Sequence, residues 1–275
     1  MSYFLKRNEQ NLFHGKFSTF PDFVTHAIST RIGGVSSAPY DSLNLGLHVG
    51  DVDENVSANR EKFARSLGFQ LDDIVTPNQI HGVNIVRVDE SHRGRGSKIY
   101  ADSIEKTDAL ITNVENLPLM LCFADCVPIL FVDADNRAVG LAHGGWKGTV
   151  NKIAAKTFSA MREHFGTKAE NCLVGIGPSI GACCYKVGDE VKISCEKNFP
   201  NHDELIINRD GKFFFDLQAA NKIQLEEVGL PSENIDVASE CTCCNSNFYF
   251  SYRAARKNNL TETGRIAALI ALKGD

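Results

Sequence analysis

ADCVPILFVDADNRAVGLAHGGWKG, residues 124–148, is the stretch of sequence that decides the fold. It contains two apolar runs, Val127 to Val132 and Ala138 to Ala142, on either side of a short polar segment. That segment, Asp133-Ala134-Asp135-Asn136, is rich in residues that favour tight turns. Two apolar runs joined by such a turn are typical of a β-hairpin, and we expect one here.

The length of the hairpin loop decides which residues face each other. A two-residue loop pairs Asp133 with Asn136 and, in the same register, Cys126 with His143, whereas a three-residue loop shifts the match by one position. Pro128 favours an edge strand or a bulge, because proline cannot donate to a sheet ladder. In either register the Cys126 thiol and the His143 imidazole are expected to be neighbours. A thiolate beside an imidazole is half of a transition-metal site, although a lone cysteine beside apolar strands is also typical of core filling.

Outside the hairpin, helix and strand patterns alternate. Helical periodicity predicts helices over Asp53 to Leu67, Val150 to Phe165 and Asp216 to Val228, each followed by a glycine. Further strands are expected at 84–88, 109–112, 120–123, 173–176, 213–215 and 267–272. Repeats, low-complexity tracts and linkers are absent from the sequence. We therefore expect an α/β or α+β fold, a single compact domain over residues 1–275 with mixed β-sheets flanked by helices.

Composition and charge exclude several classes of protein. A content of 43% hydrophobic and 23% charged residues is ordinary for a globular chain. The net charge of −5 leaves no basic surplus to neutralise a phosphate backbone, so we expect no nucleic-acid partner. Because no apolar run is long enough to span a bilayer and the N-terminal residues lack a secretory signal, we expect a soluble, cytoplasmic protein without a membrane partner.

The chain has nine cysteines, several of them crowded in Cys183-Cys184 and Cys241-Thr242-Cys243-Cys244. An odd and crowded set suits reduced thiols better than a disulfide framework. Cys241 and Cys244 form a C-x-x-C pair, but the sequence has no second such pair to complete a four-cysteine zinc site. Buried thiols and a secondary metal contact remain the alternatives for the roles of Cys241, Cys243 and Cys244.

Seven segments, in family order and spread over nearly the whole chain, resemble the laccase-domain, YfiH-like family of purine nucleoside phosphorylases, which has also been described as multicopper polyphenol oxidases. They are Thr30-Arg31-Ile32-Gly33-Gly34-Val35-Ser36, Ser42-Leu43-Asn44-Leu45, Asn78-Gln79-Ile80-His81-Gly82, Thr107-Asp108-Ala109, Ala124-Asp125-Cys126-Val127-Pro128, His143-Gly144-Gly145-Trp146-Lys147-Gly148 and Phe250-Ser251-Tyr252-Arg253. Two departures are mild: Lys147 stands where many members carry arginine, and the C-terminal cysteine cluster is larger than usual.

The resemblance implies one zinc ion per chain, held by His81, Cys126 and His143. Three protein ligands leave the fourth tetrahedral position for water, which is typical of a catalytic zinc. Copper could bind at the same thiolate, because Cu(II) outcompetes zinc at most sites with nitrogen and sulfur donors. The resemblance also implies phosphorolysis of adenosine, inosine, guanosine and S-methyl-5′-thioadenosine, together with deamination of adenosine. The H-x-E and P-C-x-x-C signature of cytidine-deaminase-like enzymes is absent, so the deamination would be convergent chemistry.

Phosphorolysis also requires groups that hold phosphate near the anomeric carbon. Arg31, in a glycine-flanked turn, can grip phosphate with a fork of donors, and the Gly144 to Gly148 run, with Gly145 and Lys147, can offer donors at the start of the following helix. Asn44 and Arg253 are further candidate contacts to ribose or phosphate. The structural alternatives are a surface arginine and a glycine turn that admits a helix.

Three other functions stay open. A copper-dependent polyphenol oxidase needs several coppers, whereas the sequence has eight histidines and no H-x-H pair. A metal-free hydrolase would use Cys126 as nucleophile and His81 or His143 as base. A non-catalytic metal-binding or purine-binding module would bind adenosine without turnover. The preferred base, the balance of phosphorolysis and deamination, and the oligomeric state stay open as well.

Overall fold

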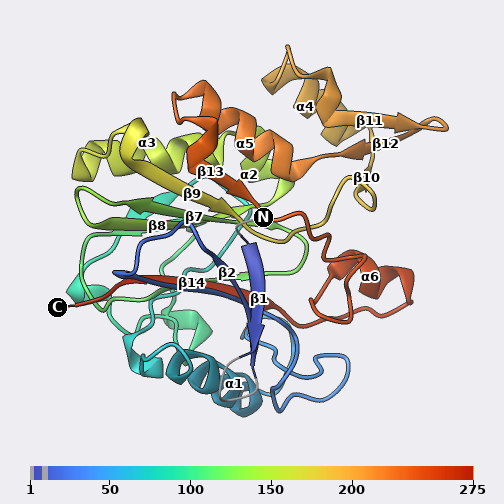
Figure 1. The fold of residues 1–275 in the computed structure, drawn as a ribbon. Helices are drawn as coiled ribbons and strands as arrows, with labels where there is room; N and C mark the ends of the chain where they lie inside the picture. Colours follow the sequence, from blue (N-terminus) through green and yellow to red (C-terminus); the bar gives the residue numbers. More distant parts are fainter. Residues whose placement is uncertain (1–2, 8–11, 275) are drawn as a thin grey trace.

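Two large β-sheets pack face to face between layers of helices in the computed structural model, which describes residues 3–7 and 12–274 (Figure 1). The antiparallel five-stranded sheet contains, in spatial order, β1 (Tyr3–Arg7), β2 (Phe13–Phe17), β3 (Val24–Ser29), β14 (Ile266–Leu272) and β6 (Leu119–Phe123). The mixed six-stranded sheet contains β13 (Ile235–Val237), β9 (Cys172–Ile176), β7 (Val127–Asp133), β8 (Ala138–Gly144), β5 (Ala109–Thr112) and β4 (Ile85–Arg87).

A small third sheet and six α-helices complete the described fold. The sheet contains β10 (Lys186–Val187), β12 (Lys212–Phe215) and β11 (Ile206–Arg209). The helices are α1 (Asp53–Arg65), α2 (Trp146–Val150), α3 (Ile153–Phe165), α4 (Asp189–Asn198), α5 (Leu217–Glu227) and α6 (Tyr252–Lys257). Short 3-10 turns lie at Leu71–Asp73, Glu90–His92, Tyr100–Asp102, Ala169–Asn171, Asp203–Leu205 and Ser232–Asn234.

Strand β14 shows why the sheets stack in layers. All seven of its residues are apolar and buried, and successive side chains point to opposite faces. Ile266, Ala268 and Ile270 face the core between the two large sheets, whereas Ala267 and Leu269 face the core under α1. Each fully buried isoleucine or leucine side chain contributes roughly 1.5–3 kcal/mol to folding. Helices α3 and α5 cover the outer face of the six-stranded sheet, so the layer order is helix, sheet, sheet, helix (Figure 1).

The predicted hairpin is present as β7 and β8, but its predicted register is wrong. Asp133 pairs with Ala138 across a four-residue loop, in place of the two or three residues expected. The loop is longer because Asp133 Oδ1 accepts the backbone N–H groups of Asp135 and Asn136, and Arg137 takes a left-handed conformation. Cys126 therefore lies one residue before β7, and His143 pairs with Pro128.

The expectation that Pro128 marks an edge strand or a bulge is also wrong. Strand β7 lies between β8 and β9 in the middle of its sheet, and its pairing with β8 runs through Pro128 without interruption. The proline is tolerated because the ladder between β7 and β9 begins only at Ile129 and Ile176. Pro128 uses its carbonyl oxygen to accept the Gly177 N–H at 2.8 Å, and no donor is required from it there.

The expectation of a mixed α/β fold with sheets flanked by helices is confirmed. Each predicted strand is present, with bounds shifted by at most two residues. The predicted helix from Val150 to Phe165 begins three residues later, as α3, because Lys152 before it has a left-handed φ of 65°; Val150 ends the separate helix α2. Elements without a clear pattern were not predicted, such as α4, which buries only Val191 and Cys195.

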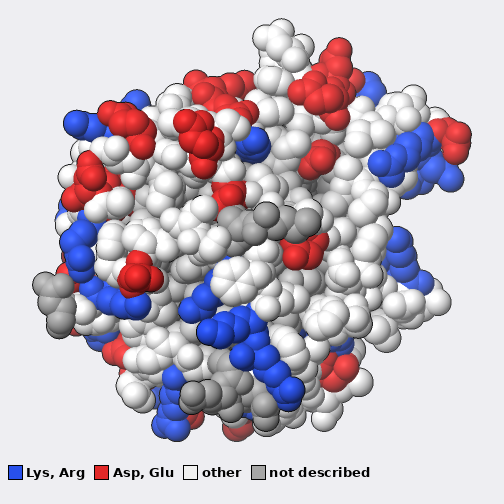
Figure 2. Space-filling view, viewed as in Figure 1, with Lys and Arg blue, Asp and Glu red and all other residues white. Residues whose placement is uncertain are grey.

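None of the described helices is long and apolar enough to cross a bilayer. Figure 2 shows both acidic and basic side chains on one face of the molecule, with several basic side chains grouped below its centre.

Candidate active site

Three side chains with soft or borderline donor atoms meet at one end of the β7–β8 hairpin. Cys126 directly precedes β7, His143 is near the end of β8, and His81 comes from the loop before β4. Their candidate ligand atoms all lie within 4.8 Å of one another. The two imidazole rings meet edge to face, with 4.7 Å between their centroids. The sequence expectation that Cys126 and His143 are neighbours is therefore confirmed despite the shifted register.

A buried carboxylate, that of Asp108, orients the His143 imidazole and holds the loop that carries His81. Its Oδ1 lies 2.9 Å from Nδ1 of His143, which leaves Nε2 of that ring to face the cluster. The same carboxylate accepts the backbone N–H groups of Ile80, His81 and Gly82 at 3.2, 2.9 and 2.7 Å. These bonds hold the loop in which His81 has a left-handed φ of 60°. Such a carboxylate behind a histidine is the usual outer partner of a metal ligand.

The electrostatics of the cluster favour an ionised thiol. Burial alone would raise the pKa of Cys126, but the facing imidazoles of His143 and His81 lower it below the usual value for a thiol. Burial alone would lower the pKa of His143, but the Cys126 sulfur and the Asp108 carboxylate raise it. A thiolate beside two imidazoles is a donor set that zinc and copper both accept. This site could therefore hold a metal ion.

Close packing around the cluster requires a glycine at position 145. A Cβ atom there would lie 2.7 Å from Cδ2 of His81 and 3.4 Å from Sγ of Cys126. The first distance is well inside van der Waals contact, so any side chain would displace the His81 ring. Gly145 thus contributes through its lack of a side chain.

The cluster opens into a cavity of about 360 Å³. This volume is within the usual range for a small-molecule site. The lining combines aromatic rings, polar groups and two arginines with the three candidate ligands: His48, Gln79, His81, Cys122, Ala124, Asp125, Cys126, His143, Ile180, Tyr185, Tyr252, Arg253 and Arg265.

A family model described as multi-copper polyphenol oxidoreductase laccase matches residues 25–273. The chain belongs to this laccase family. The resemblance carried by the seven sequence segments is therefore confirmed.

Two named relatives and a solved structure show what the chain is similar to. Purine nucleoside phosphorylase YlmD from Geobacillus stearothermophilus is 40% identical over 247 residues, which is 88% of each chain. Adenosine deaminase RL5 from an unknown prokaryotic organism is 34% identical over 82% of this chain and 87% of its own length. The crystal structure of the hypothetical protein YfiH from Bacillus licheniformis matches with a TM-score of 0.91 at 36% identity, over 98% of this chain and 99% of that one.

In this member of the laccase family, the two arginines of the cavity are held from outside it. Arg253 donates from Nη1 to the Cys184 carbonyl at 2.8 Å and from Nη2 to the Lys186 carbonyl at 3.0 Å. Arg265 donates only from Nη1, to the carbonyls of Thr263 and Gly264. Its Nε and Nη2 have no acceptor among the described residues, so these donors are available to a bound anion.

Arg31 does not share the cavity with the three candidate ligands. It lines a neighbouring cavity of about 390 Å³. Its guanidinium donates to the carbonyls of Asp41 and Ser246, pairs with the Asp41 carboxylate at 3.2 Å, and lies over the Phe250 ring. Most of its donors are therefore engaged within the protein.

Asn44 is fully buried and does not line either cavity. Its Oδ1 accepts the backbone N–H groups of Gly46 and Arg265, and its Nδ2 donates to Asp51 at 2.9 Å. The expected contact of Asn44 with ribose or phosphate is thus not supported by its position. It fixes the backbone of Arg265 instead.

Lys147 also lies outside the lining of the cavity. Its side chain is exposed, with Nζ 5.5 Å from the centre of the Trp146 ring. Trp146 is half-buried against the core between the six-stranded sheet and helices α3 and α5. Helix α2, which follows Gly145, has only five residues. Of the expected phosphate contacts, only Arg253 shares the cavity with the candidate metal ligands.

Asp108, Arg265 and Tyr185 are site residues that the sequence reasoning missed. Asp108 stands in the segment Thr107-Asp108-Ala109, already singled out by the resemblance, so its position was available as a signal. Arg265 lies in none of the segments singled out in the sequence, and Tyr185 follows the crowded Cys183-Cys184 pair without a signal of its own. Only the packing of distant segments brings them to the cavity.

Proposed function

We propose that this chain is a zinc-dependent purine nucleoside phosphorylase that also deaminates adenosine. The observation that carries the proposal is the convergence of His81, Cys126 and His143 in a cavity of nucleoside size. Relatives named purine nucleoside phosphorylase and adenosine deaminase, at 40% and 34% identity, support it.

The three candidate ligands would hold one zinc ion per chain with its fourth position open. When bound there, zinc would supply Lewis-acid activation of water for deamination and stabilisation of negative charge. The donor set fits this role, because a thiolate and two imidazoles suit a borderline-soft cation. Asp108 supports it by fixing the orientation of His143 and the loop of His81.

The remaining cavity residues suit a purine nucleoside and phosphate. Tyr185 and Tyr252 offer aromatic faces on which a purine can stack. Phosphorolysis develops positive charge on the ribose, so phosphate must be held close to the anomeric carbon. We assign this task to Arg265 and Arg253, in preference to Arg31, because Arg31 is bound to Asp41 and lies in the neighbouring cavity.

Product analysis tests this proposal. Pure protein is incubated with adenosine, with and without phosphate, and adenine, ribose 1-phosphate and inosine are resolved by chromatography. We expect phosphate-dependent adenine release and phosphate-independent inosine formation. Cys126→Ala should abolish both while Cys195→Ala, which removes a buried thiol outside the cavity, should retain them. Full turnover by Cys126→Ala, or adenosine left unchanged by the native protein, would overturn the proposal.

A metal-free cysteine hydrolase is the second candidate, favoured by the order of carboxylate, imidazole and thiol in Asp108, His143 and Cys126. In that case Cys126 would be the nucleophile and His143 the base. Chelation and alkylation separate the two functions. Loss of activity on zinc removal supports the phosphorylase, whereas a metal-free active protein that is inactivated by one equivalent of alkylating agent supports the hydrolase.

Copper-dependent oxidation of phenols is tested in the same preparation, because the family description names copper. Among the described residues, the two groups able to hold a metal include only one with histidine, which would give a single copper centre. Phenol oxidation by copper-loaded protein that exceeds purine turnover by zinc-loaded protein would favour the oxidase.

A further inference from the structure

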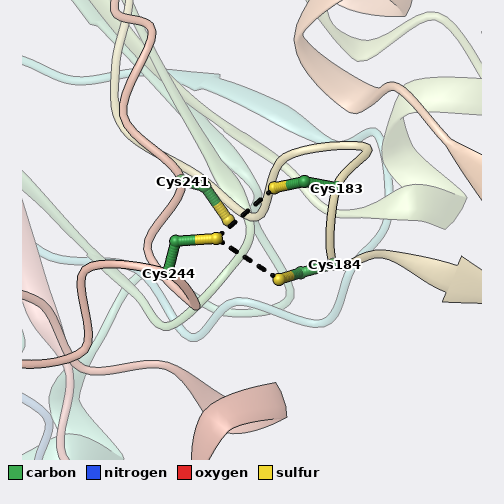
Figure 3. A group of neighbouring side chains, drawn as sticks. All are labelled: Cys183, Cys184, Cys241 and Cys244. Atoms are coloured by element: carbon green, nitrogen blue, oxygen red, sulfur yellow. Dashed lines mark hydrogen bonds between the residues drawn. The ribbon is translucent and has the colours of Figure 1, made fainter.

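Four cysteine side chains converge beside the cavity, outside the cluster described above (Figure 3). Cys183 and Cys184 come from the turn between β9 and β10, and Cys241 and Cys244 from the loop between β13 and α6. Their sulfur atoms all lie within 4.8 Å of one another. The Sγ atom of Cys244 is 3.6 Å from that of Cys183 and 3.5 Å from that of Cys184.

We propose that these four thiolates bind a second metal ion, Zn²⁺, in a closed structural site. Zinc in such sites is tetrahedral with Zn–S bonds of about 2.3 Å, so the sulfur atoms lie about 3.8 Å apart. The separations of 3.6 and 3.5 Å from Cys244 to Cys183 and Cys184 are close to this value, and all four sulfurs lie within 4.8 Å of one another. Small shifts of side chains would therefore admit the ion.

Backbone contacts hold together the two loops that carry the four sulfurs. Ser179 and Cys241 form a β-bridge between the two loops, in which the Thr242 N–H donates to the Ser179 carbonyl at 2.9 Å. The C-x-x-C segment turns on itself, with the Asn245 N–H donating to the Cys241 carbonyl at 3.0 Å. A site that is ordered in advance binds its ion without the cost of ordering the loops.

Groups around the sulfurs suit a negatively charged zinc–thiolate centre. The Gly181 N–H donates to Sγ of Cys241 at 3.2 Å, a contact typical of the surroundings of metal-bound thiolates. Lys257 places its ammonium 3.8 Å from Sγ of Cys184 and 3.6 Å from Sγ of Cys243. Its positive charge offsets part of the charge of four thiolates.

Core filling does not account for this cluster. Cys183 and Cys244 are exposed, whereas cysteines that fill cores are buried. The sequence expectation missed the site because it required a second C-x-x-C pair. The adjacent Cys183 and Cys184 supply the missing two thiols, because both side chains point from their turn toward Cys241 and Cys244 (Figure 3).

The second ion would brace one wall of the cavity. Cys184 directly precedes the cavity residue Tyr185, and its carbonyl accepts Nη1 of Arg253. Asp125 joins the other loop to this wall, because it accepts the Thr242 hydroxyl and the Arg253 N–H, both at 2.7 Å. Zinc at the four cysteines therefore fixes Tyr185 and Arg253, a role in activity that rests on the proposed function.

Metal stoichiometry tests the site without reference to activity. Untagged protein is purified under reducing conditions, reconstituted with Zn²⁺, desalted and assayed for metal and protein. We expect about two zinc ions per chain in the native protein, about one in Cys183→Ser/Cys244→Ser, and about one in Cys126→Ala. Cys243→Ser is the matched control and should keep about two, because this neighbouring thiol lies outside the four-cysteine group.

Cobalt substitution supplies a second measurement that does not depend on the stability of the double variant. Co²⁺ added to Cys126→Ala should give the intense absorption of a tetrahedral tetrathiolate centre. Absence of that spectrum, absence of zinc from Cys126→Ala, or loss of zinc in Cys243→Ser would overturn the four-cysteine site. A purified native protein that carries iron or a Cys184–Cys244 disulfide after zinc reconstitution would overturn it as well. Failure of the purine assay with two zinc ions bound would contradict the proposed function alone.

Discussion

Oδ1 of Asp108 lies 2.9 Å from Nδ1 of His143 and 2.9 Å from the backbone nitrogen of His81. Through this one buried carboxylate, the position of the loop before β4 depends on the orientation of a side chain at the end of β8. The candidate metal cluster is thus supported from behind by a group that touches neither the cavity nor a substrate.

Asp108→Asn is expected to lower the affinity for zinc about 10- to 100-fold, because an amide cannot accept all the N–H groups that the carboxylate accepts. Competition with a chromophoric chelator measures the affinity. Asp102→Asn, which changes an exposed carboxylate, is the control. Equal zinc affinity in native protein and Asp108→Asn would show that Asp108 does not support the metal site.

Gly145→Ala is expected to reduce purine turnover about tenfold or more, because the added Cβ would lie 2.7 Å from the His81 ring. Its free energy of unfolding, measured by thermal denaturation, should fall by no more than about 3 kcal/mol, as at other overpacked sites. Gly188→Ala is the matched control, because a Cβ there meets nothing within 4 Å. An active Gly145→Ala variant would contradict the tight packing of the cluster.

Arg265→Met should separate the two proposed reactions. Loss of a charged hydrogen bond to phosphate costs about 1.5–3 kcal/mol, so we expect the KM for phosphate to rise about 10- to 100-fold. Inosine formation, which needs no phosphate, should change much less. Arg256→Met, at an exposed position of α6, is the control. Parallel loss of both reactions would assign Arg265 a structural role.

His26 is expected to make the protein sensitive to acid. Burial, together with the charges of Lys16 and His14, lowers the pKa of His26 to about 3, and its Nε2 accepts the Phe17 N–H at 2.9 Å. Between about pH 6.5 and pH 3, the unfolded chain binds a proton at this residue that the folded chain does not. The free energy of unfolding should therefore fall by up to about 1.4 kcal/mol for each unit of decreasing pH through this window.

Urea unfolding of His26→Gln between pH 7 and pH 4 measures this effect. The variant should be less stable than native protein at pH 7 but lose stability less steeply as the pH falls. His164→Gln, at an exposed position of α3, should keep the native slope. An unchanged slope in His26→Gln would show that His26 is protonated equally in both states.

The β7–β8 hairpin shows which features of the site could be predicted from the sequence alone. Its apolar runs fix the two strands, and any short loop keeps Cys126 near His143, so this pair was predicted correctly. The register was not, because the bonds from Asp133 to its own loop and the left-handed Arg137 produce a four-residue turn. Local turn geometry of this kind is weakly encoded in composition.

Long-range packing accounts for the other differences. Arg31 has the chemistry to bind an anion, but Asp41 engages it in the neighbouring cavity. Cys183 and Cys244 are 61 residues apart in the sequence, and their loops meet through tertiary contacts such as the bridge between Ser179 and Cys241. Arg265 reaches the cavity from the residue before β14, a strand that pairs with β3 and β6.

Metal removal and restoration during adenosine turnover test the central claim most directly. Chelator-treated protein, desalted and freed of zinc at His81, Cys126 and His143, should release neither adenine nor inosine, and added Zn²⁺ should restore both. Undiminished turnover by protein shown to contain no metal would contradict the account.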